Sequence, residues 1–140
     1  MTRVDFYVLG GSGSRARDHF ACRLAEKAWK QDNAVFIRVA NLEAAKQLDE
    51  MMWTFRDGSF VPHDIVGTSS QPAPISIGTD HPEVSADLLI NLTDAVPDDA
   101  GSFARVAEIV TSDDDSKARS RQRFSAYRDA GHELQTHKLQ

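Results

Sequence analysis

Short apolar runs alternate with amphipathic stretches along the first half of the chain. Residues 4–9 and 34–40 are rich in β-branched and aromatic side chains and too short for helices, so they predict buried strands. Between them, over residues 16–31, apolar positions recur three and four apart, which predicts an amphipathic helix. Asn41 is a suitable cap for a second helix over residues 42–55. This strand–helix–strand–helix order favours a largely parallel sheet covered by helices.

The middle of the chain predicts three further strands separated by loops. Residues 64–66 and 75–77 are short strand-like segments, and residues 87–92 form a more apolar run that suits a central strand. Residues 67–74 are rich in Ser, Pro and Gly, which predicts a loop, and residues 79–85 predict another.

Two more helices are predicted near the C-terminus. Residues 102–110 place their apolar side chains on one helical stripe. Residues 113–130 begin with three aspartates, which favour the positive end of a helix dipole, and stop at Gly131. A last extended segment is allowed within residues 132–140. The pattern as a whole predicts one domain over residues 1–140, a three-layer, Rossmann-like α/β fold with helices on both faces of the sheet.

Composition excludes several classes of protein. The 140 residues are 41% hydrophobic, which suits a globular domain, and no apolar run approaches the roughly 20 residues of a membrane span. The N-terminus shows no basic segment typical of a signal peptide. A net charge of −5 argues against a surface that coats nucleic acid as a whole, although it leaves room for a local basic patch. No membrane contact is therefore expected, and nucleic acid is expected as an indirect partner only.

The single cysteine and the histidines predict no redox or metal chemistry. Cys22 lies in a helical pattern, so a small buried hydrophobe is expected, and the absence of a second cysteine fits a reducing cytoplasm. The five histidines are scattered without ligand spacing, so no metal is assigned.

The loop after the first predicted strand suggests an alternative function. Gly11-Ser-Gly13-Ser-Arg-Ala16 fits the G-x-G-x-x-G/A pattern that holds a pyrophosphate at a helix N-terminus, as in a Rossmann-type nucleotide-dependent oxidoreductase. The second strand, however, ends near Arg38 without the acid that binds a ribose hydroxyl. Arg38 is open to two interpretations, a partner for a 2′-phosphate or a solvated side chain. We expect no cofactor.

The last predicted helix carries a basic stripe. Three cations four and seven residues apart share one narrow face: Lys117, Arg121 and Arg128. Phe124 lies between the last two, whereas Arg119 and Arg123 are expected to point elsewhere into solvent. An ordinary solubilising surface is one interpretation. A basic stripe with an apolar centre also suits an acidic peptide that ends in an aromatic residue and a free carboxylate.

Aromatic and methionine side chains concentrate around a predicted turn at Asp57-Gly58. Leu48 and Met52 have helical spacing and are expected in the core. Trp53 and Phe60 flank the turn, and turns normally run over the surface. An exposed aromatic pair beside a rigid turn is typical of an anchor for a partner protein.

Two motifs resemble one known family. The first is Leu48-Asp-Glu-x-x-Trp53 followed by Ser59-Phe-Val-Pro-His63, and the second covers residues 121–131, Arg-Gln-Arg-Phe-Ser-Ala-Tyr-Arg-Asp-Ala-Gly. Both are similar to the chi subunit family of the bacterial DNA polymerase III holoenzyme, and the resemblance extends over the whole chain. It implies a cytoplasmic, non-catalytic clamp-loader accessory protein with a Rossmann-like fold that binds no nucleotide.

The resemblance also implies two protein partners and a state of monomer or 1:1 heterodimer. The psi subunit of the clamp loader is expected on one surface: Trp53, Phe60, Val61 and Pro62. The acidic C-terminal tail of single-stranded-DNA-binding protein is expected on another: Val110, Lys117, Arg121, Phe124 and Arg128. Ser125 departs from the family pattern, which has a further basic residue there, so one charge contact to the tail is lost.

Overall fold

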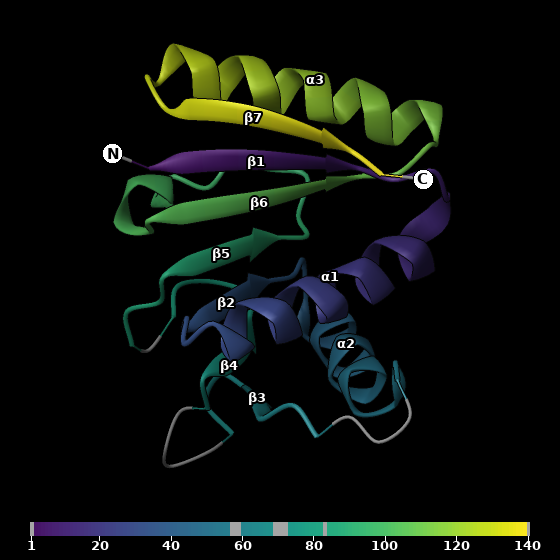
Figure 1. Ribbon diagram of the computed structural model, residues 1–140, viewed down its shortest axis with the longest axis vertical. Coiled ribbons are helices and arrows are strands. Elements are labelled where there is room, and N and C mark those ends of the chain that lie inside the picture. The colour runs from purple at the N-terminus through teal and green to yellow at the C-terminus, as the bar shows by residue number, and fades with distance from the viewer. Residues whose placement is uncertain (1, 57–59, 69–72, 83, 140) are drawn as a thin grey trace.

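In the described part of the chain, seven strands lie parallel in one sheet, in the order β3-β4-β2-β5-β6-β1-β7 (Figure 1). The computed structural model describes residues 2–56, 60–68, 73–82 and 84–139. The strands are β1 (Arg3–Val8), β2 (Val35–Arg38), β3 (His63–Ile65), β4 (Ile75–Gly78), β5 (Leu88–Asn91), β6 (Arg105–Val110) and β7 (Glu133–Lys138).

Helices cover both faces of this sheet. α1 (Gly13–Lys30) and α2 (Leu42–Thr54) pack on one face, and α3 (Asp114–Asp129) packs on the other beside β6, β1 and β7 (Figure 1). The predicted three-layer, Rossmann-like α/β class is therefore confirmed. None of the helices in the described ranges is long and apolar enough to cross a membrane.

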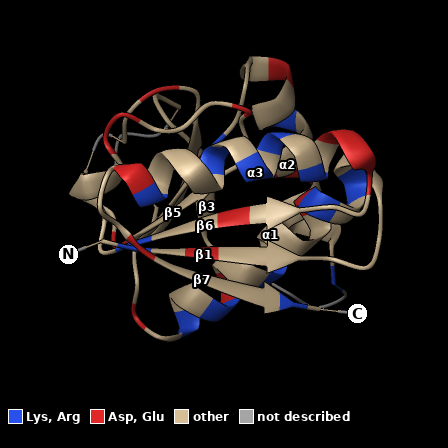
Figure 2. Cartoon of the chain, turned by 90° about the horizontal axis from the view of Figure 1, so that it is seen from above, with Lys and Arg blue, Asp and Glu red and all other residues tan. Residues whose placement is uncertain are grey.

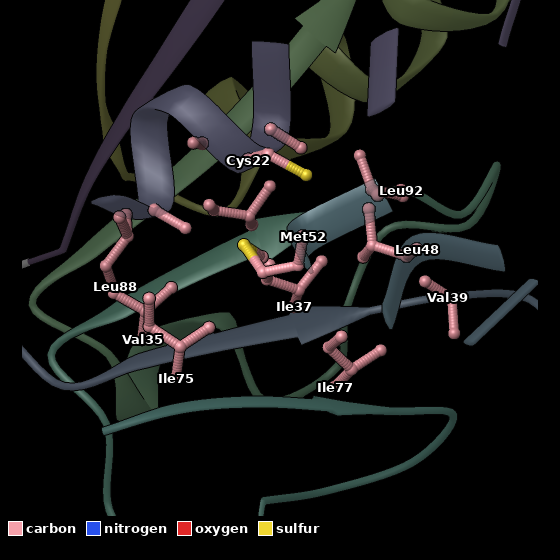
Figure 3. Packing of buried hydrophobic residues seen from close by; sticks show 14 of the residues in the cluster. Cys22, Val35, Ile37, Val39, Leu48, Met52, Ile75, Ile77, Leu88 and Leu92 are labelled. Carbon is pink, nitrogen blue, oxygen red and sulfur yellow. The ribbon is translucent and has the colours of Figure 1, made fainter. Parts of the chain in front are cut away.

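Alternation along the strands divides the core into two halves. In β2, Val35 and Ile37 belong to the cluster under α1 and α2, whereas Phe36 between them belongs to the cluster under α3. Successive side chains of a strand point to opposite faces, so β2, β5 and β6 each contribute buried side chains to both clusters. Cys22 and Met52 lie fully buried in the first cluster, as expected from their helical spacing (Figure 3).

Residues 102–110 correct the prediction of a helix. After a short 3-10 turn, η1 (Ala100–Ser102), the chain enters strand β6. Val106 and Val110 face α3 while Ala107 and Ile109 face α1 and α2, so both faces of the strand are buried. A parallel strand buried on both faces is apolar at most positions, and such a run contains helical spacings by coincidence.

The other predicted elements occur close to their expected positions. The strands expected at 64–66, 75–77 and 87–92 are β3, β4 and β5, and the helix expected at 113–130 is α3. The extended segment allowed at the C-terminus is β7, which adds an edge strand to β1. The predicted turn at Asp57-Gly58 and part of the predicted loop at 67–74 lie outside the described residues.

Candidate protein-binding surfaces

The basic stripe of α3 lies on the solvent side of the helix. Lys117, Arg121 and Arg128 are all exposed, and the helix shows an acidic first turn followed by bands of Lys and Arg (Figure 2). Arg128 lies near its exposed neighbour Asp129, at 3.7 Å between Nε and Oδ1. Within the described ranges, Lys117 and Arg121 have no acidic partner. Their charges are therefore available to an external anion.

The apolar residues expected beside this stripe are partly or wholly core. The ring of Phe124 is half-buried, with its centroid 5.2 Å from that of Phe6 on β1, so packing accounts for part of its presence. Val110, at the end of β6, is only 4% exposed. The contact of Val110 with a partner stays a prediction, and most of its side chain packs in the core under α3.

Two further arginines of α3 differ in their environment. Arg119 is exposed and 3.2 Å from exposed Asp94, as expected for a solvated side chain. Arg123 was expected in solvent, and this is wrong. It is buried, with Nε 3.0 Å from Oε1 of Glu108 on β6. The inner face of α3 is polar, since Ser120 and Tyr127 are buried on the same side.

Glu108 lies at the centre of a buried polar network. Its carboxylate accepts hydrogen bonds from Arg123 Nε at 3.0 Å, Asn91 Nδ2 at 2.8 Å and Tyr127 Oη at 2.6 Å. Burial raises the pKa of Glu108 and Arg123 opposes that shift. This network was not predicted from the sequence, although one signal was present: an acid within an otherwise apolar run at residues 106–110.

A second candidate surface lies at the end of α2 and the start of β3. Trp53 is 54% exposed and Phe60 83% exposed, and Pro62 is also exposed, as expected for a docking surface. Val61 is 1% exposed and packs in the cluster under α1 and α2. Its role in binding psi stays a prediction, and its side chain adds no exposed area to this surface.

The ring of buried His63 packs against the ring of Trp53. The two rings are 4.5 Å apart between centroids, and the His63 side chain is buried. Nδ1 lies 2.7 Å from the Val61 carbonyl oxygen, which can only accept, so Nδ1 donates. Nε2 lies 3.2 Å from Asp49 Oδ1 on α2. His63, at the start of β3, thus lies against both Trp53 and Asp49 of α2.

The glycine loop already holds an anion supplied by the chain itself. α1 begins at Gly13, whose φ of +86° requires glycine, and the Gly13 N–H donates to Asp113 Oδ2 at 3.1 Å. The Thr111 hydroxyl donates to the same oxygen at 2.6 Å. These bonds, the Thr111 bond first, lower the pKa of Asp113. The Asp113 carboxylate therefore takes one of the donors that a pyrophosphate would need.

The Arg38 side chain forms hydrogen bonds with Asp80 and Asp99. Contrary to the interpretations of a solvated side chain or a phosphate ligand, Arg38 is buried and donates to both oxygens of Asp99 at 2.8 Å. It also donates to the Asp80 carbonyl at 2.7 Å. Chiefly through the Arg38 hydrogen bonds, the pKa of Asp99 falls to about 2. Within the described ranges, His81, Asp98 and Asp99 form a group with metal-ligand atoms within 4.8 Å of one another, but Arg38 already binds Asp99.

We expect NADPH to leave the melting temperature unchanged. The Asp113 carboxylate occupies the N-terminus of α1, where the pyrophosphate of the cofactor would bind. Arg38 is paired with Asp99, so the 2′-phosphate also lacks its usual partner. A ligand at 100 times its Kd stabilises a fold by about 2.7 kcal/mol, an effect that thermal unfolding resolves easily. Scanning unfolding with and without millimolar NADPH measures it. A dose-dependent rise in Tm would favour the oxidoreductase.

Comparison with known proteins identifies relatives over nearly the whole chain. The family model described as "DNA polymerase III chi subunit, HolC" matches residues 1–135. DNA polymerase III subunit chi of Pseudomonas aeruginosa is 41% identical over 140 residues, covering 99% of this chain and 98% of the relative. The protein of the same name from Escherichia coli is 32% identical over 143 residues and covers 97% of each chain.

A solved structure extends the likeness of the fold. The crystal structure of T4 UvsW matches with a TM-score of 0.64 at 9% identity. The match covers 99% of this chain and 41% of the UvsW chain. At this identity the likeness concerns the fold alone.

Proposed function

We propose that this chain, which belongs to the DNA polymerase III chi subunit family, is a non-catalytic accessory subunit that joins two protein partners during DNA replication. Acting as one domain, it binds the psi subunit of the clamp loader through the exposed surface formed by Trp53, Phe60 and Pro62. It binds the acidic C-terminal tail of single-stranded-DNA-binding protein through the α3 stripe.

One observation carries this proposal: the two candidate surfaces lie on opposite sides of the sheet. α2, which presents Trp53, packs in the layer with α1, and α3 packs in the other layer (Figure 1). Two partners placed on these surfaces do not compete for the same residues. The arrangement suits a bridge that holds both at once.

The character of each surface supports its proposed partner. Trp53, Phe60 and Pro62 place exposed apolar area together, and Trp and Phe are enriched in the buried centres of protein interfaces. Such a surface suits an apolar segment of psi. Lys117 and Arg121 offer unpaired charge within the described ranges, which suits a flexible acidic tail.

Replacing Phe60 with alanine is expected to weaken psi binding by about thirtyfold, the equivalent of 2 kcal/mol. The ring is 83% exposed and contributes little to the core, so the melting transition should stay nearly in place. Isothermal titration with psi measures the affinity. Val84→Ala, which shortens an exposed apolar side chain on the connection between β4 and β5, is the matched control and should bind normally.

Bridging itself is tested by titrating the labelled tail peptide onto the preformed complex with psi. We expect the peptide affinity to match that of the free chain within about twofold, since the surfaces are separate. Displacement of psi by the peptide, or normal psi binding by an unstable Phe60→Ala variant, contradicts the proposal.

A further inference from the structure

A cleft of about 1240 Å³ opens along α1, apart from both surfaces described above. It runs from the end of β1 and the loop at residues 10–12, past α1, to Phe55 and Arg56, which directly follow α2. Leu139 also lines the cleft. Neither Trp53 nor Phe60 lines it, and α3 packs on the other face of the sheet.

Basic side chains follow the α1 wall of this cleft at a constant interval. Members of the row are four residues apart, so each step advances about 6 Å along the helix and turns by only about 40°. The row consists of Arg15, His19, Arg23 and Lys27, all exposed. In the described part of the chain, Arg15, Arg23 and Lys27 have no ion-pair partner.

The far end of the cleft adds one more cation and, among the described residues that line it, the only acid. Arg56 approaches Glu26 at 2.6 Å between Nη2 and Oε2, and Glu26 is largely buried. Four Arg and Lys side chains therefore face one carboxylate in the cleft, although the whole chain has a net charge of −5. The local field favours an anionic ligand.

Aromatic rings supply the apolar part of the lining. Tyr7, Phe20 and Phe55 are each half-buried and reach the cleft. The rings of Tyr7 and Phe20 lie 5.4 Å apart between centroids, and the His19 ring meets Phe55 edge-on at 6.2 Å. The rings thus stand beside the row of cations on α1 rather than in a separate patch.

We propose that this cleft binds single-stranded nucleic acid directly, with phosphates along the α1 cations and bases against the aromatic rings. A polyanion with regularly spaced charges matches cations at a constant interval. Unpaired bases stack on aromatic side chains, and a positively charged groove with such rings is the usual arrangement for binding single strands without sequence preference. This site goes beyond the bridging function, in which the chain reaches DNA only through another protein.

The test is fluorescence anisotropy of a labelled 15-nucleotide oligothymidylate with the full chain and no other protein present. At 50 mM salt we expect a Kd between about 1 and 100 µM. Three neutralised phosphates give a slope of log affinity against log salt of about −2, so a rise to 200 mM salt weakens binding about 20-fold. Because psi and single-stranded-DNA-binding protein are absent, the outcome is independent of the bridging proposal.

Charge reversal locates the site. The double variant Arg23→Glu, Lys27→Glu should weaken the binding of oligothymidylate at least tenfold. The slope of log affinity against log salt should become shallower, between about −1 and 0. Lys46→Glu reverses an exposed cation on α2 outside the cleft and should bind within about twofold of wild type. Phe55→Leu keeps apolar volume without the ring and should weaken binding by about fivefold or more.

Melting curves accompany every variant, so that a loss of binding is attributed to the site only where Tm is retained. Unchanged oligothymidylate affinity in the folded double variant overturns the proposal. So does a fluorescent polyglutamate peptide that binds through Arg23 and Lys27 while oligothymidylate does not, because the cleft would then be a peptide site.

Discussion

Glu108→Ala is expected to destabilise the fold by about 3–5 kcal/mol, because the substitution leaves Arg123 buried without its carboxylate. Asn91 and Tyr127 also lose an acceptor in the interior. At about 4 °C for each kcal/mol in a domain of this size, Tm should fall by roughly 12–20 °C. Urea unfolding followed by circular dichroism measures the change.

Two comparisons separate this effect from a general loss of a charge. Glu133→Ala removes an exposed carboxylate from the edge strand β7 and should alter stability by no more than about 0.5 kcal/mol. Replacing both partners, Glu108→Leu with Arg123→Leu, should recover part of the loss, because an apolar pair carries no buried charge while the Tyr127 hydroxyl still lacks its acceptor. A Glu108→Ala protein within about 1 kcal/mol of wild type would show that water reaches and solvates Arg123.

Strand β6 shows where pattern reading reaches its limit. The first strands were predicted correctly because each apolar run is short, rich in β-branched side chains and bounded by polar residues. Over residues 102–110 the spacing also fits a helix, and only the pairing of β6 with both β1 and β5 decides for a strand. That pairing belongs to the tertiary structure and cannot be predicted from a short stretch of sequence.

The same limit applies to the basic stripe. Helical geometry placed Lys117, Arg121 and Arg128 on one exposed face correctly. It failed for Arg123, since α3 turns a largely polar face to the sheet and the partner Glu108 sits fifteen residues earlier on a strand. Similarly, Arg38 pairs with Asp99, a partner sixty-one residues later that no motif links to it. Burial of a charge depends on such distant partners.

Exposed side chains beside a turn were easier to predict than their neighbours. Trp53 and Phe60 were expected at the surface and are exposed, while Val61 between Phe60 and Pro62 points inward. Adjacent residues of an extended chain face opposite directions, so a three-residue motif cannot lie wholly on one surface. The residue-level assignment needed the backbone, although the motif itself was found from the sequence.

Arg121→Ala is expected to weaken binding of the acidic tail by roughly 10- to 150-fold, the equivalent of one charge-assisted hydrogen bond of about 1.5–3 kcal/mol. We propose that Arg121 binds the terminal carboxylate, because it is exposed, has no acidic partner among the described residues and precedes Phe124 by three positions. Half-buried Phe124 then offers its remaining surface to the final aromatic residue of the tail. Anisotropy of a labelled tail peptide measures the affinity.

The neighbouring cations provide a graded comparison for that result. Lys117→Ala and Arg128→Ala each remove an exposed charge worth about 0.2–1 kcal/mol, so each should weaken the tail by no more than about fivefold. Arg128 should matter least, since Asp129 lies 3.7 Å away and competes for it. Both losses should shrink as salt rises and screens exposed charges, whereas the Arg121→Ala loss should persist. Equal losses of affinity at all three positions would mean that the acidic tail is attracted by the overall positive charge of the stripe. Arg121 would then make no specific contact with the terminal carboxylate of the tail.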